Sequence, residues 1–333
     1  MHVSGLHVKK TGVGRRSILA AVVAAVVALA GGVTTAQAAD AYRPRIFAGY
    51  PGWDHLMPFL DQELGIWAAY GLDPIFDSGS SQRVSQVLQT GDWDAAYTQI
   101  ATALTYRARG LPIVIAAASS YGSATVVARK DLGAAKDITK FGIVRQMDTM
   151  HLLAAEHILP AHGIDPKAVR FIQVPPPEAG IALDRADIDA YYVYEPYASQ
   201  MVAKGQAKLL WDWREVFANG EIYRNALVLN ENFIKAHPEE AKKVVWAHLA
   251  ALNIIRTDPD KAAAVLAQRA KTSVEAAMLG YAKAGWDHST VPESFLKLTE
   301  DDLLKWKIIS KPIDLKTAVD FSLQQGYQPP NLK

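Results

Sequence analysis

The stretch Asp187-Ile188-Asp189-Ala190-Tyr191-Tyr192-Val193-Tyr194-Glu195-Pro196 indicates how this chain is built. Its apolar centre, 190–193, is flanked by acidic residues and ends in a Tyr-Glu-Pro corner. A short apolar run of this kind is typical of a buried strand in a parallel sheet. We therefore expect Tyr194 and Glu195 to reach a surface at the carboxyl end of that strand.

A similar stretch, Asp92-Trp93-Asp94-Ala95-Ala96-Tyr97-Thr98-Gln99, occurs 95 residues earlier (187 − 92). Both stretches follow a helix-like segment, and both contain Asp-x-Asp-Ala followed by Tyr. This separation is too long for a solenoid repeat, but it suits two similar α/β lobes. Two lobes that both carry strand-end loops predict a cleft.

Composition excludes several classes of function. The chain has 333 residues, of which 50% are hydrophobic and 21% charged, so it is long enough for two domains with proper cores. Its formal net charge of +1 gives no sign of binding to nucleic acid or to a membrane surface. The absence of cysteine excludes thiol catalysis, disulfides, cysteine-based metal sites and a lipoprotein anchor.

The first 38 residues have the pattern of a signal peptide. A basic segment containing Lys9, Lys10, Arg15 and Arg16 precedes an apolar run over 18–30, and Ala36-Gln37-Ala38 is a small-x-small cleavage site. The apolar run is too short to span a bilayer. Arg15-Arg16 also resembles a twin-arginine export signal, so export is indicated while its route stays open. We expect the mature protein to work in the periplasm.

The remaining chain alternates strand-like and helix-like segments, which predicts mostly parallel sheets with helices on both faces. Asp54 is a candidate N-cap for the helix after the first strand. The expected strands are 45–49, 72–76, 95–97, 113–117, 124–128, 141–144, 169–174, 190–193, 208–210 and 226–229. After the last strand, helices are expected at 238–256, 258–270, 273–284, 300–307 and 315–325.

Ligands of such sheets bind beyond the carboxyl ends of the strands. The helix start at Ser80-Ser81 is either an anion seat or a plain serine cap, because both use the unpaired N–H groups of a first turn. The strand-end candidates in the first half are Tyr50, Trp53, Asp54, Ser80, Ser81, Tyr97, Thr98, Gln99, Ser119 and Tyr121.

No catalytic motif occurs in the chain: G-x-S-x-G, H-E-x-x-H, the Walker loop and G-x-G-x-x-G are all missing. His151, His157 and His162 share a predicted helix, but offsets of five and six residues do not place metal ligands on one face. We expect them to be solvated, and we predict no metal site and no cofactor. Binding is therefore favoured over catalysis, and no catalytic residue is assigned.

The order of several short motifs resembles a known family. After the export signal come Gly49-Tyr50, then Leu64-Gly65-Ile66-Trp67 and Tyr70-Gly71-Leu72-Asp73, then Gln89-Thr90-Gly91-Asp92-Trp93-Asp94-Ala95, Gly110-Leu111-Pro112-Ile113 and finally Tyr194-Glu195-Pro196. Together they resemble the periplasmic solute-binding proteins of ABC transporters for nitrate, sulfonate and taurine, a family that includes thiamine-precursor binders. The resemblance covers essentially the whole mature chain.

The resemblance implies a type II periplasmic-binding-protein fold: two doubly wound α/β lobes, joined by two crossing strands, with the ligand in the cleft. Lobe one would comprise 43–128 plus 225–333, and lobe two 129–224. The implied partner is a membrane permease, and the implied state is a monomer. By position, the family's ligand residues correspond to Tyr50, Trp53, Ser80, Gln99, Asp148, Thr149, Tyr194 and Glu195. Glu195→Ala is then expected to weaken ligand binding and leave the free protein stable.

The chain departs from the family at Arg145-Gln146-Met147-Asp148-Thr149, where many members have a Pro-x-Gly-Ser loop. Asp148 repels an anion at that helix start, unless it acts only as an N-cap. Arg83, Arg145 and Ser80-Ser81 suit a carboxylate or sulfonate, whereas Asp54, Asp148 and Glu195 suit an amine. A taurine-like zwitterion and an aromatic carboxylate both remain open.

Two other functions also remain open. The first is that the chain binds a thiamine pyrimidine precursor, or is an enzyme on the same fold. The cysteine-rich signature of the family's pyrimidine-synthesising enzyme branch is missing, which argues against the enzyme. The other is a sensory protein that has no permease partner.

Overall fold

The computed structural model describes residues 1–2, 5, 43–215 and 222–332. The chain divides into the units Met1–Ala41 and Tyr42–Lys333, and both five-stranded sheets belong to the second. Apart from residues 1, 2 and 5, the predicted signal peptide lies outside the described residues. Among the described residues, none of the helices combines the length and the apolar character needed to cross a membrane.

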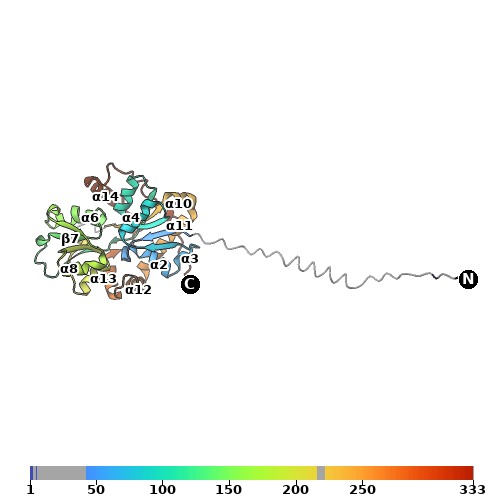
Figure 1. The fold of residues 1–333 in the computed structure, drawn as a ribbon, viewed down its shortest axis with the longest axis horizontal. Coiled ribbons are helices and arrows are strands. Elements are labelled where there is room, and N and C mark those ends of the chain that lie inside the picture. Colours follow the sequence, from blue (N-terminus) through green and yellow to red (C-terminus); the bar gives the residue numbers. More distant parts are fainter. Residues whose placement is uncertain (3–4, 6–42, 216–221, 333) are drawn as a thin grey trace. The chain divides into compact units, whose positions relative to one another are not determined.

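Two five-stranded sheets form the centres of two α/β lobes, so the expected architecture is confirmed (Figure 1). The first sheet has the order β2-β1-β3-β11-β4, with β1 Arg45–Ala48, β2 Ile75–Ser78, β3 Ala95–Gln99, β4 Ile113–Ala118 and β11 Asn225–Asn230. The second has the order β10-β6-β9-β7-β8, with β6 Ala124–Ala128, β7 Lys140–Ile143, β8 Arg170–Gln173, β9 Ala190–Tyr194 and β10 Lys208–Asp212.

Strand direction brings the carboxyl ends of several strands to one edge of each sheet. In the first sheet β1 pairs in parallel with β2 and β3, and in the second β7 pairs in parallel with β8 and β9. Strands β11 and β6 run antiparallel to their neighbours. The apolar stretch 190–193 forms most of β9, and every residue of that strand is buried, as its composition predicts.

The chain crosses between the sheets twice. It leaves the first sheet after β4, passes through β5 (Tyr121–Gly122), and enters the second sheet at β6. It returns into β11, and the two crossings pair with each other through the Tyr121↔Tyr223 bridge and a 2.9 Å bond from Gly122 N to Ile222 O. Strand β6, which the expected boundary at residue 128 assigned to lobe one, hydrogen-bonds to β9 and β10 of the second sheet.

Helices cover both faces of the first sheet. Along β11, Ala226 and Val228 pack with α4 and α5, while Leu227 and Leu229 pack with α2, α11 and α12, as the two-residue period of a strand requires. The helices are α2 Met57–Glu63, α3 Ile66–Ala69, α4 Ser81–Thr90, α5 Ile100–Ala108, α6 Thr149–Leu153, α7 Leu159–Ala161, α8 Ala179–Asp184, α9 Tyr197–Ala203, α10 Glu231–Ala236, α11 Pro238–Thr257, α12 Pro259–Ala270, α13 Val274–Tyr281 and α14 Glu293–Lys305.

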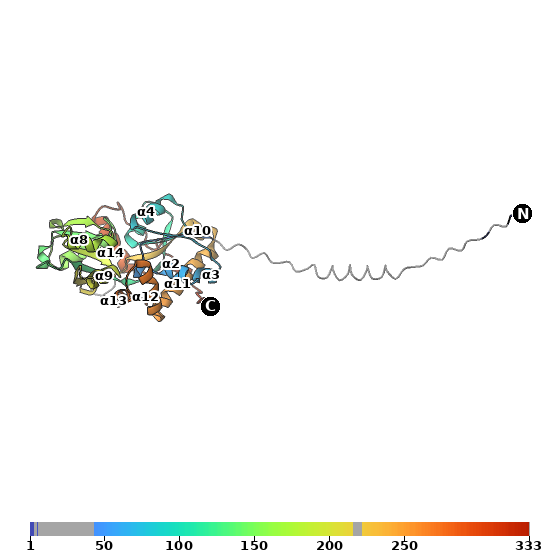
Figure 2. The same cartoon turned by 60° about the horizontal axis from the view of Figure 1, so that its bottom comes forward.

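Shorter turns complete the described chain, and one late helix bridges the lobes. The short elements are η1 Trp53–His55, η2 Ala135–Asp137, η3 Ala154–Ile158, η4 Pro166–Ala168, η5 Pro176–Glu178, η6 Trp213–Glu215, η7 Phe321–Gln324 and the strand β12 Ala284–Gly285. Helix α13 packs on α9 of lobe two, as Figure 2 shows from a second side. The late helices therefore contact both lobes.

Three expected elements differ from the structure. Strand β2 begins at Ile75 instead of residue 72, because Pro74 has no N–H to donate and the ladder opens with Ile75 N bonded to Pro44 O. Asp54 is not an N-cap: α2 is preceded by Leu56 without a side-chain cap. The segment 315–325 is no α-helix, because Val319 bridges to Ile115 at the edge of β4 and only η7 is helical.

We expected His151, His157 and His162 to be solvated, but each contacts other side chains. His151 is 4% exposed and its ring lies 4.4 Å from Phe171 and 5.0 Å from Trp306. His162 stacks on Trp211 at 3.9 Å, and His157 bonds Asp302 at 2.9 Å. Tertiary neighbours distant in sequence supply these contacts, so the helical pattern alone could not show them.

We expect Asp189→Ala to lower the free energy of unfolding by about 1–3 kcal/mol, because the buried carboxylate accepts bonds from Thr139 and Lys140 and pairs with Arg129. Burial raises the pKa of Asp189, but these bonds outweigh it and the net pKa is lowered. The stabilisation is therefore present above the unfolded pKa and is lost as pH falls through the lower folded pKa.

Urea unfolding at neutral pH and at pH 3 measures the effect. The matched control is Asp131→Ala, which removes an exposed partner of the same Arg129 and should leave stability nearly unchanged. Equal losses in the two variants would contradict the assignment.

Candidate functional site

A cavity of about 240 Å³ lies between the carboxyl ends of the two sheets, and we call it the cleft pocket. Lobe one contributes Tyr50, two residues after β1, and the start of α4. Lobe two contributes the segment that follows β7, the end of β8 and the residues after it. The lining residues are Tyr50, Ser80, Ser81, Gln82, Val144, Arg145, Gln173, Pro175 and Pro176. Both lobes must be in place to form it.

A smaller space of about 10 Å³ adjoins this pocket through Ser81 and Arg145, which line both, and we call it the inner pocket. Its other walls include His55, Tyr97 and Gln99. The Tyr97 hydroxyl bonds Nδ1 of His248 at 3.1 Å, and Nε2 of His248 bonds the Ala118 carbonyl at 2.8 Å. Burial lowers the pKa of His248 to about 4, so the ring is neutral and Tyr97 is held by the core.

The charge of the cleft pocket is positive. Arg145 is the one formally charged side chain among its lining residues, and no carboxylate lines it. Ser80 caps α4 by accepting a 3.2 Å bond from Arg83 N, so the pocket also meets the first turn of a ten-residue helix. The unpaired N–H groups and dipole of a helix start favour an anion, as does a guanidinium. The sequence did not decide whether Ser80 and Ser81 bind an anion or only cap the helix. In the structure Ser80 caps α4 and also lines the pocket.

Gln99 and Thr149 bond across the lobes beside the inner pocket. Thr149 N donates to Gln99 Oε1 at 3.2 Å, and Ala101 N donates to Thr149 Oγ1 at 3.1 Å. Next to them Asp148 is buried and caps α6 by accepting from His151 N at 2.9 Å. Burial raises the pKa of Asp148 to about 6 against the opposing effect of its hydrogen bonds. Its carboxylate lines neither pocket, so the repulsion of an anion is weaker than its position in the sequence suggested.

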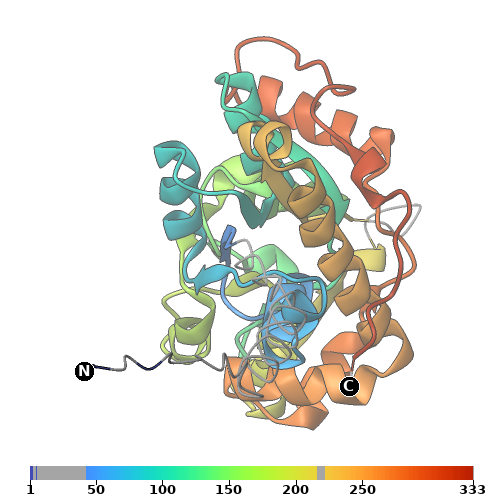
Figure 3. The same ribbon diagram turned by 90° about the vertical axis from the view of Figure 1, so that its right-hand side faces the viewer.

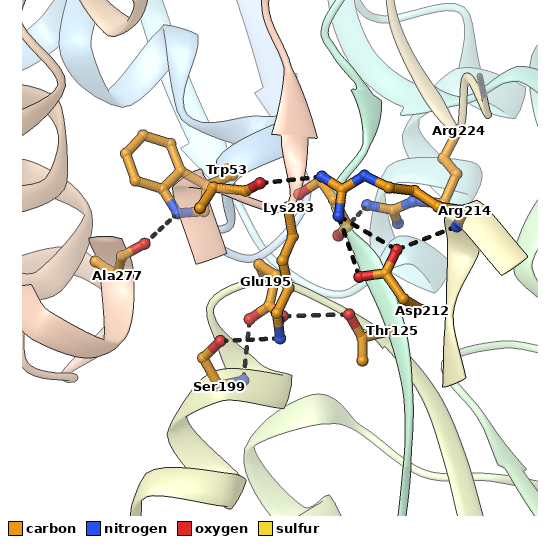
Figure 4. Close-up of polar contacts among 11 residues, drawn as sticks. Trp53, Thr125, Glu195, Ser199, Asp212, Arg214, Arg224, Ala277 and Lys283 are labelled. Carbon is orange, nitrogen blue, oxygen red and sulfur yellow. Dashed lines mark hydrogen bonds and ion pairs between the residues drawn. The ribbon is translucent and has the colours of Figure 1, made fainter. Parts of the chain in front are cut away.

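Glu195 makes its bonds with protein groups. Oε1 accepts from Lys283 Nζ at 2.9 Å and from Thr125 Oγ1 at 3.3 Å, and Oε2 accepts from Ser199 N at 2.9 Å (Figure 4). The side chain is fully buried. Its backbone carbonyl also accepts from Trp53 N across the lobes at 3.0 Å. Glu195 therefore joins the residues that follow α13 to β6 and α9, and its carboxylate is occupied without a ligand.

Asp54 pairs with a buried arginine where the crossings meet. Its Oδ2 lies 2.7 Å from Nη2 of Arg224, a side chain 1% exposed, and it also accepts from Asn225. The same guanidinium donates to Ser123 O at 3.1 Å. It lies over the ring of Tyr194 at 5.5 Å. A charge buried so deeply is stable only when it is paired in this way.

Trp53 and Tyr194 are packing residues in this structure. The Trp53 indole is fully buried, donates to Ala277 O at 2.7 Å (Figure 4), and lies 5.4 Å from Trp286. The Tyr194 ring is 4% exposed and lies so close to Gly52 that a Cβ there would meet it at 2.7 Å. Neither side chain lines the cleft pocket.

The structure thus divides the residues expected from the sequence into groups. Those that line the cleft or inner pocket are Tyr50, Ser80, Ser81, Tyr97, Gln99 and Arg145. Asp148 and Thr149 lie beside Gln99, and Trp53, Asp54, Tyr194 and Glu195 lie in the contact between lobes. Tyr121 lies in the first crossing, with its ring 5.8 Å from Tyr223, and lines neither pocket.

Sequence reasoning missed Arg224, Lys283 and Gln173. Gln173 ends β8 and could have been found by the strand-end rule applied to the second half of the chain. Arg224 and Lys283 gave no local signal, because their partners lie 170 and 88 residues away (224 − 54 and 283 − 195). Across the described residues, no three acidic or histidine side chains gather closely enough to hold a metal ion.

The chain is similar to known proteins over most of its length. The family model described as the NMT1-like family matches residues 49–271. The taurine-binding periplasmic protein of Escherichia coli K12 is 30% identical over 190 residues, which are 56% of this chain and 57% of that protein. The chain therefore matches little more than half the length of this curated relative.

Solved structures share the fold. The ligand-binding component of an ABC-type import system from Staphylococcus aureus, with zinc bound, superposes with a TM-score of 0.74 at 18% identity, covering 86% of this chain and 99% of that one. The alkanesulfonate-binding protein SsuA from Xanthomonas axonopodis pv. citri, bound to MOPS, gives 0.72 at 14% identity, covering 85% and 99%. The expected periplasmic-binding-protein fold is confirmed by these similarities.

We expect Glu195→Gln to destabilise the ligand-free protein by about 1–3 kcal/mol, because it removes a buried negative charge that accepts hydrogen bonds from Lys283 Nζ and Ser199 N. This reverses the expectation from the resemblance alone. A double-mutant cycle with Lys283→Met, followed by urea unfolding, isolates the pair and should give a coupling near 1 kcal/mol. The exposed Glu178→Gln serves as the control. An unchanged melting temperature in Glu195→Gln, together with lost ligand binding, would refute this role.

We expect Asp148→Asn to stabilise the protein at pH 8 by about 1–3 kcal/mol and to have little effect at pH 4. The folded pKa of Asp148, about 6, lies above the unfolded value, so ionisation costs stability as pH rises from about 4 to 6 and the cost persists above that. Asparagine keeps the helix cap and cannot ionise. Urea unfolding of both proteins at the two pH values measures the difference. An equal effect at both would show that the carboxyl does not titrate between them.

Proposed function

The chain belongs to the NMT1-like family, and from that premise we propose that it is the extracytoplasmic solute-binding protein of an ABC importer. It captures a small organic anion, a sulfonate or an aromatic carboxylate, between its lobes and delivers it unchanged to a membrane permease. The taurine-binding relative and the sulfonate-binding structural neighbour support this class of ligand. Export to the periplasm by the segment 1–38 and action as a monomer belong to the same proposal.

The charge of the cleft pocket is the observation that carries the choice of ligand. Arg145 and the start of α4 face the cavity, and no carboxylate lines it. Asp54 and Glu195, which could have received an amine, are paired with Arg224 and Lys283. The site therefore supports an anionic group more than an ammonium group. Tyr50, Val144, Pro175 and Pro176 provide apolar surface for the body of the ligand.

Capture uses closure of the lobes around the ligand. The cleft pocket takes residues from both lobes, so a bound solute contacts both and favours the closed arrangement. For lobe one we propose 43–118 plus 225–333, and for lobe two 124–212, with 119–123 and the chain before Asn225 as the crossings. This division follows the hydrogen bonding of the two sheets.

We expect Arg145→Met to weaken binding of the cleft ligand by about 10- to 100-fold, which is the contribution of a charge-assisted hydrogen bond. The wild-type protein is first screened by thermal shift with taurine, alkanesulfonates, aromatic carboxylates and pyrimidines, because a ligand of the folded state raises the melting temperature. Calorimetry then compares the variant with Arg170→Met, which removes an exposed arginine from β8.

The outcomes separate the alternatives. Binding of a sulfonate or carboxylate that depends on Arg145 supports the proposal. Binding of a pyrimidine alone would favour a precursor-binding protein, and consumption of a screened compound would favour an enzyme on this fold. Equal loss of affinity in both arginine variants would place the ligand elsewhere.

A further inference from the structure

A second cavity of about 240 Å³ lies in lobe one and shares no lining residue with the cleft pocket or the inner pocket. It is bounded by α11, by the segment that follows β12, and by η7 with Tyr327, and we call it the Trp286 pocket. Figure 3 shows the red C-terminal segment running past the gold helix α11, and η7 contacts that helix. Its volume approaches the lower end of small-molecule sites.

The walls of this pocket are fixed by hydrogen bonds between segments far apart in sequence. The side-chain amide of Gln324 donates to Ala116 O at 2.9 Å and to Ser289 O at 3.0 Å. Its Oε1 accepts from Ser289 Oγ at 2.8 Å. Ser289 O also accepts from Ala118 N at 2.8 Å. The cavity is therefore built onto strand β4, and a ligand would meet a preformed surface.

The indole of Trp286 offers this pocket a hydrogen-bond donor. Trp286 lines the pocket and is 6% exposed, yet its indole N–H has no hydrogen-bond partner in the described part of the chain. A buried donor left unpaired is unfavourable, and a ligand that brings an acceptor removes that cost. Leu249 and Leu252 add apolar surface beside the indole, so the pocket also suits an apolar body.

The remaining lining carries one charge of each sign. Arg256, in the last turn of α11, is exposed and has one N–H bonded to Asn253 Oδ1 at 3.0 Å. Asp287 lies on the opposite segment, and a hydrogen bond from Tyr121 with the charges of His288 and Arg256 lowers its pKa. Both groups are therefore charged at neutral pH. A guanidinium and a carboxylate on one small cavity match a ligand with both charges.

We propose that the Trp286 pocket binds a small zwitterion with an apolar side chain, such as an apolar α-amino acid. The acidic group accepts from the Trp286 N–H and from Arg256, the ammonium group pairs with Asp287, and the side chain lies on Leu249 and Leu252. This site is separate from the cleft and takes a different class of ligand, so it does not depend on the proposed transport function.

The experiment is a calorimetric titration of the full mature chain with L-leucine and with L-phenylalanine. Isovalerate and isoamylamine, which each keep one of the two charges, are the ligand controls. The variants are Trp286→Phe, which keeps an aromatic ring and deletes the N–H, and Arg256→Met. Arg145→Met tests the cleft, and Lys243→Met removes a cation of α11 that does not line the pocket.

We expect the wild-type protein to bind at least one amino acid and to bind the single-charge analogues at least tenfold more weakly. Trp286→Phe and Arg256→Met should each lose about tenfold or more, while Arg145→Met and Lys243→Met stay unchanged. Trp286→Phe shrinks a ring that packs on Trp53 and Tyr281, so we expect a lower melting temperature. Urea unfolding shows whether the variant is folded under the conditions of the titration, which separates lost binding from lost folding.

Absence of binding of both amino acids at millimolar concentration would overturn the proposal. So would binding that is lost in Arg145→Met and kept in Arg256→Met, because the amino acid would then occupy the cleft. Neither result bears on whether the cleft binds a sulfonate, so the two proposals fail separately.

Discussion

The buried guanidinium of Arg224 is the interaction on which the relation between the lobes depends. It lies immediately before β11, pairs with Asp54 of lobe one, and donates to Ser123 O in the first crossing. Its contact with the Tyr194 ring extends this network to the end of β9. A charge in such a place cannot be left unpaired without a large cost, so the two crossings and both lobes are held in register by one side chain.

A second consequence follows from how the acidic residues of the lobe contact are used. Glu195 is held by Lys283, Thr125 and Ser199, and Asp54 by Arg224. Because these carboxylates are paired with cations inside the protein and do not line the cleft pocket, that pocket keeps Arg145 as its single formal charge. In the sequence, Asp54 and Glu195 suggested a ligand with an amine. Because both are paired with cations in the structure, the remaining site suits an anion.

Much of the framework could be predicted from periodicity. The stretch 190–193 is apolar without alternation, as a strand covered on both faces must be, and it forms the buried β9. Strand-end reasoning found Tyr50, Ser80 and Ser81, because parallel strands carry their carboxyl ends to one edge. The same reasoning failed at Ala124–Ala128, because a strand's pattern does not state which sheet it joins.

The amino-acid sequence by itself determined the α/β class, the order of the elements and the loops that bound the cleft, since these follow from local patterns of apolar and polar residues. Only the tertiary structure decided which polar side chains remain available to a ligand. Lys283 reaches Glu195 and Arg224 reaches Asp54 across 88 and 170 residues, respectively (283 − 195 and 224 − 54). Whether a charge is neutralised depends on its distance in space from a charge of opposite sign, and the spacing of residues along the chain does not give that distance.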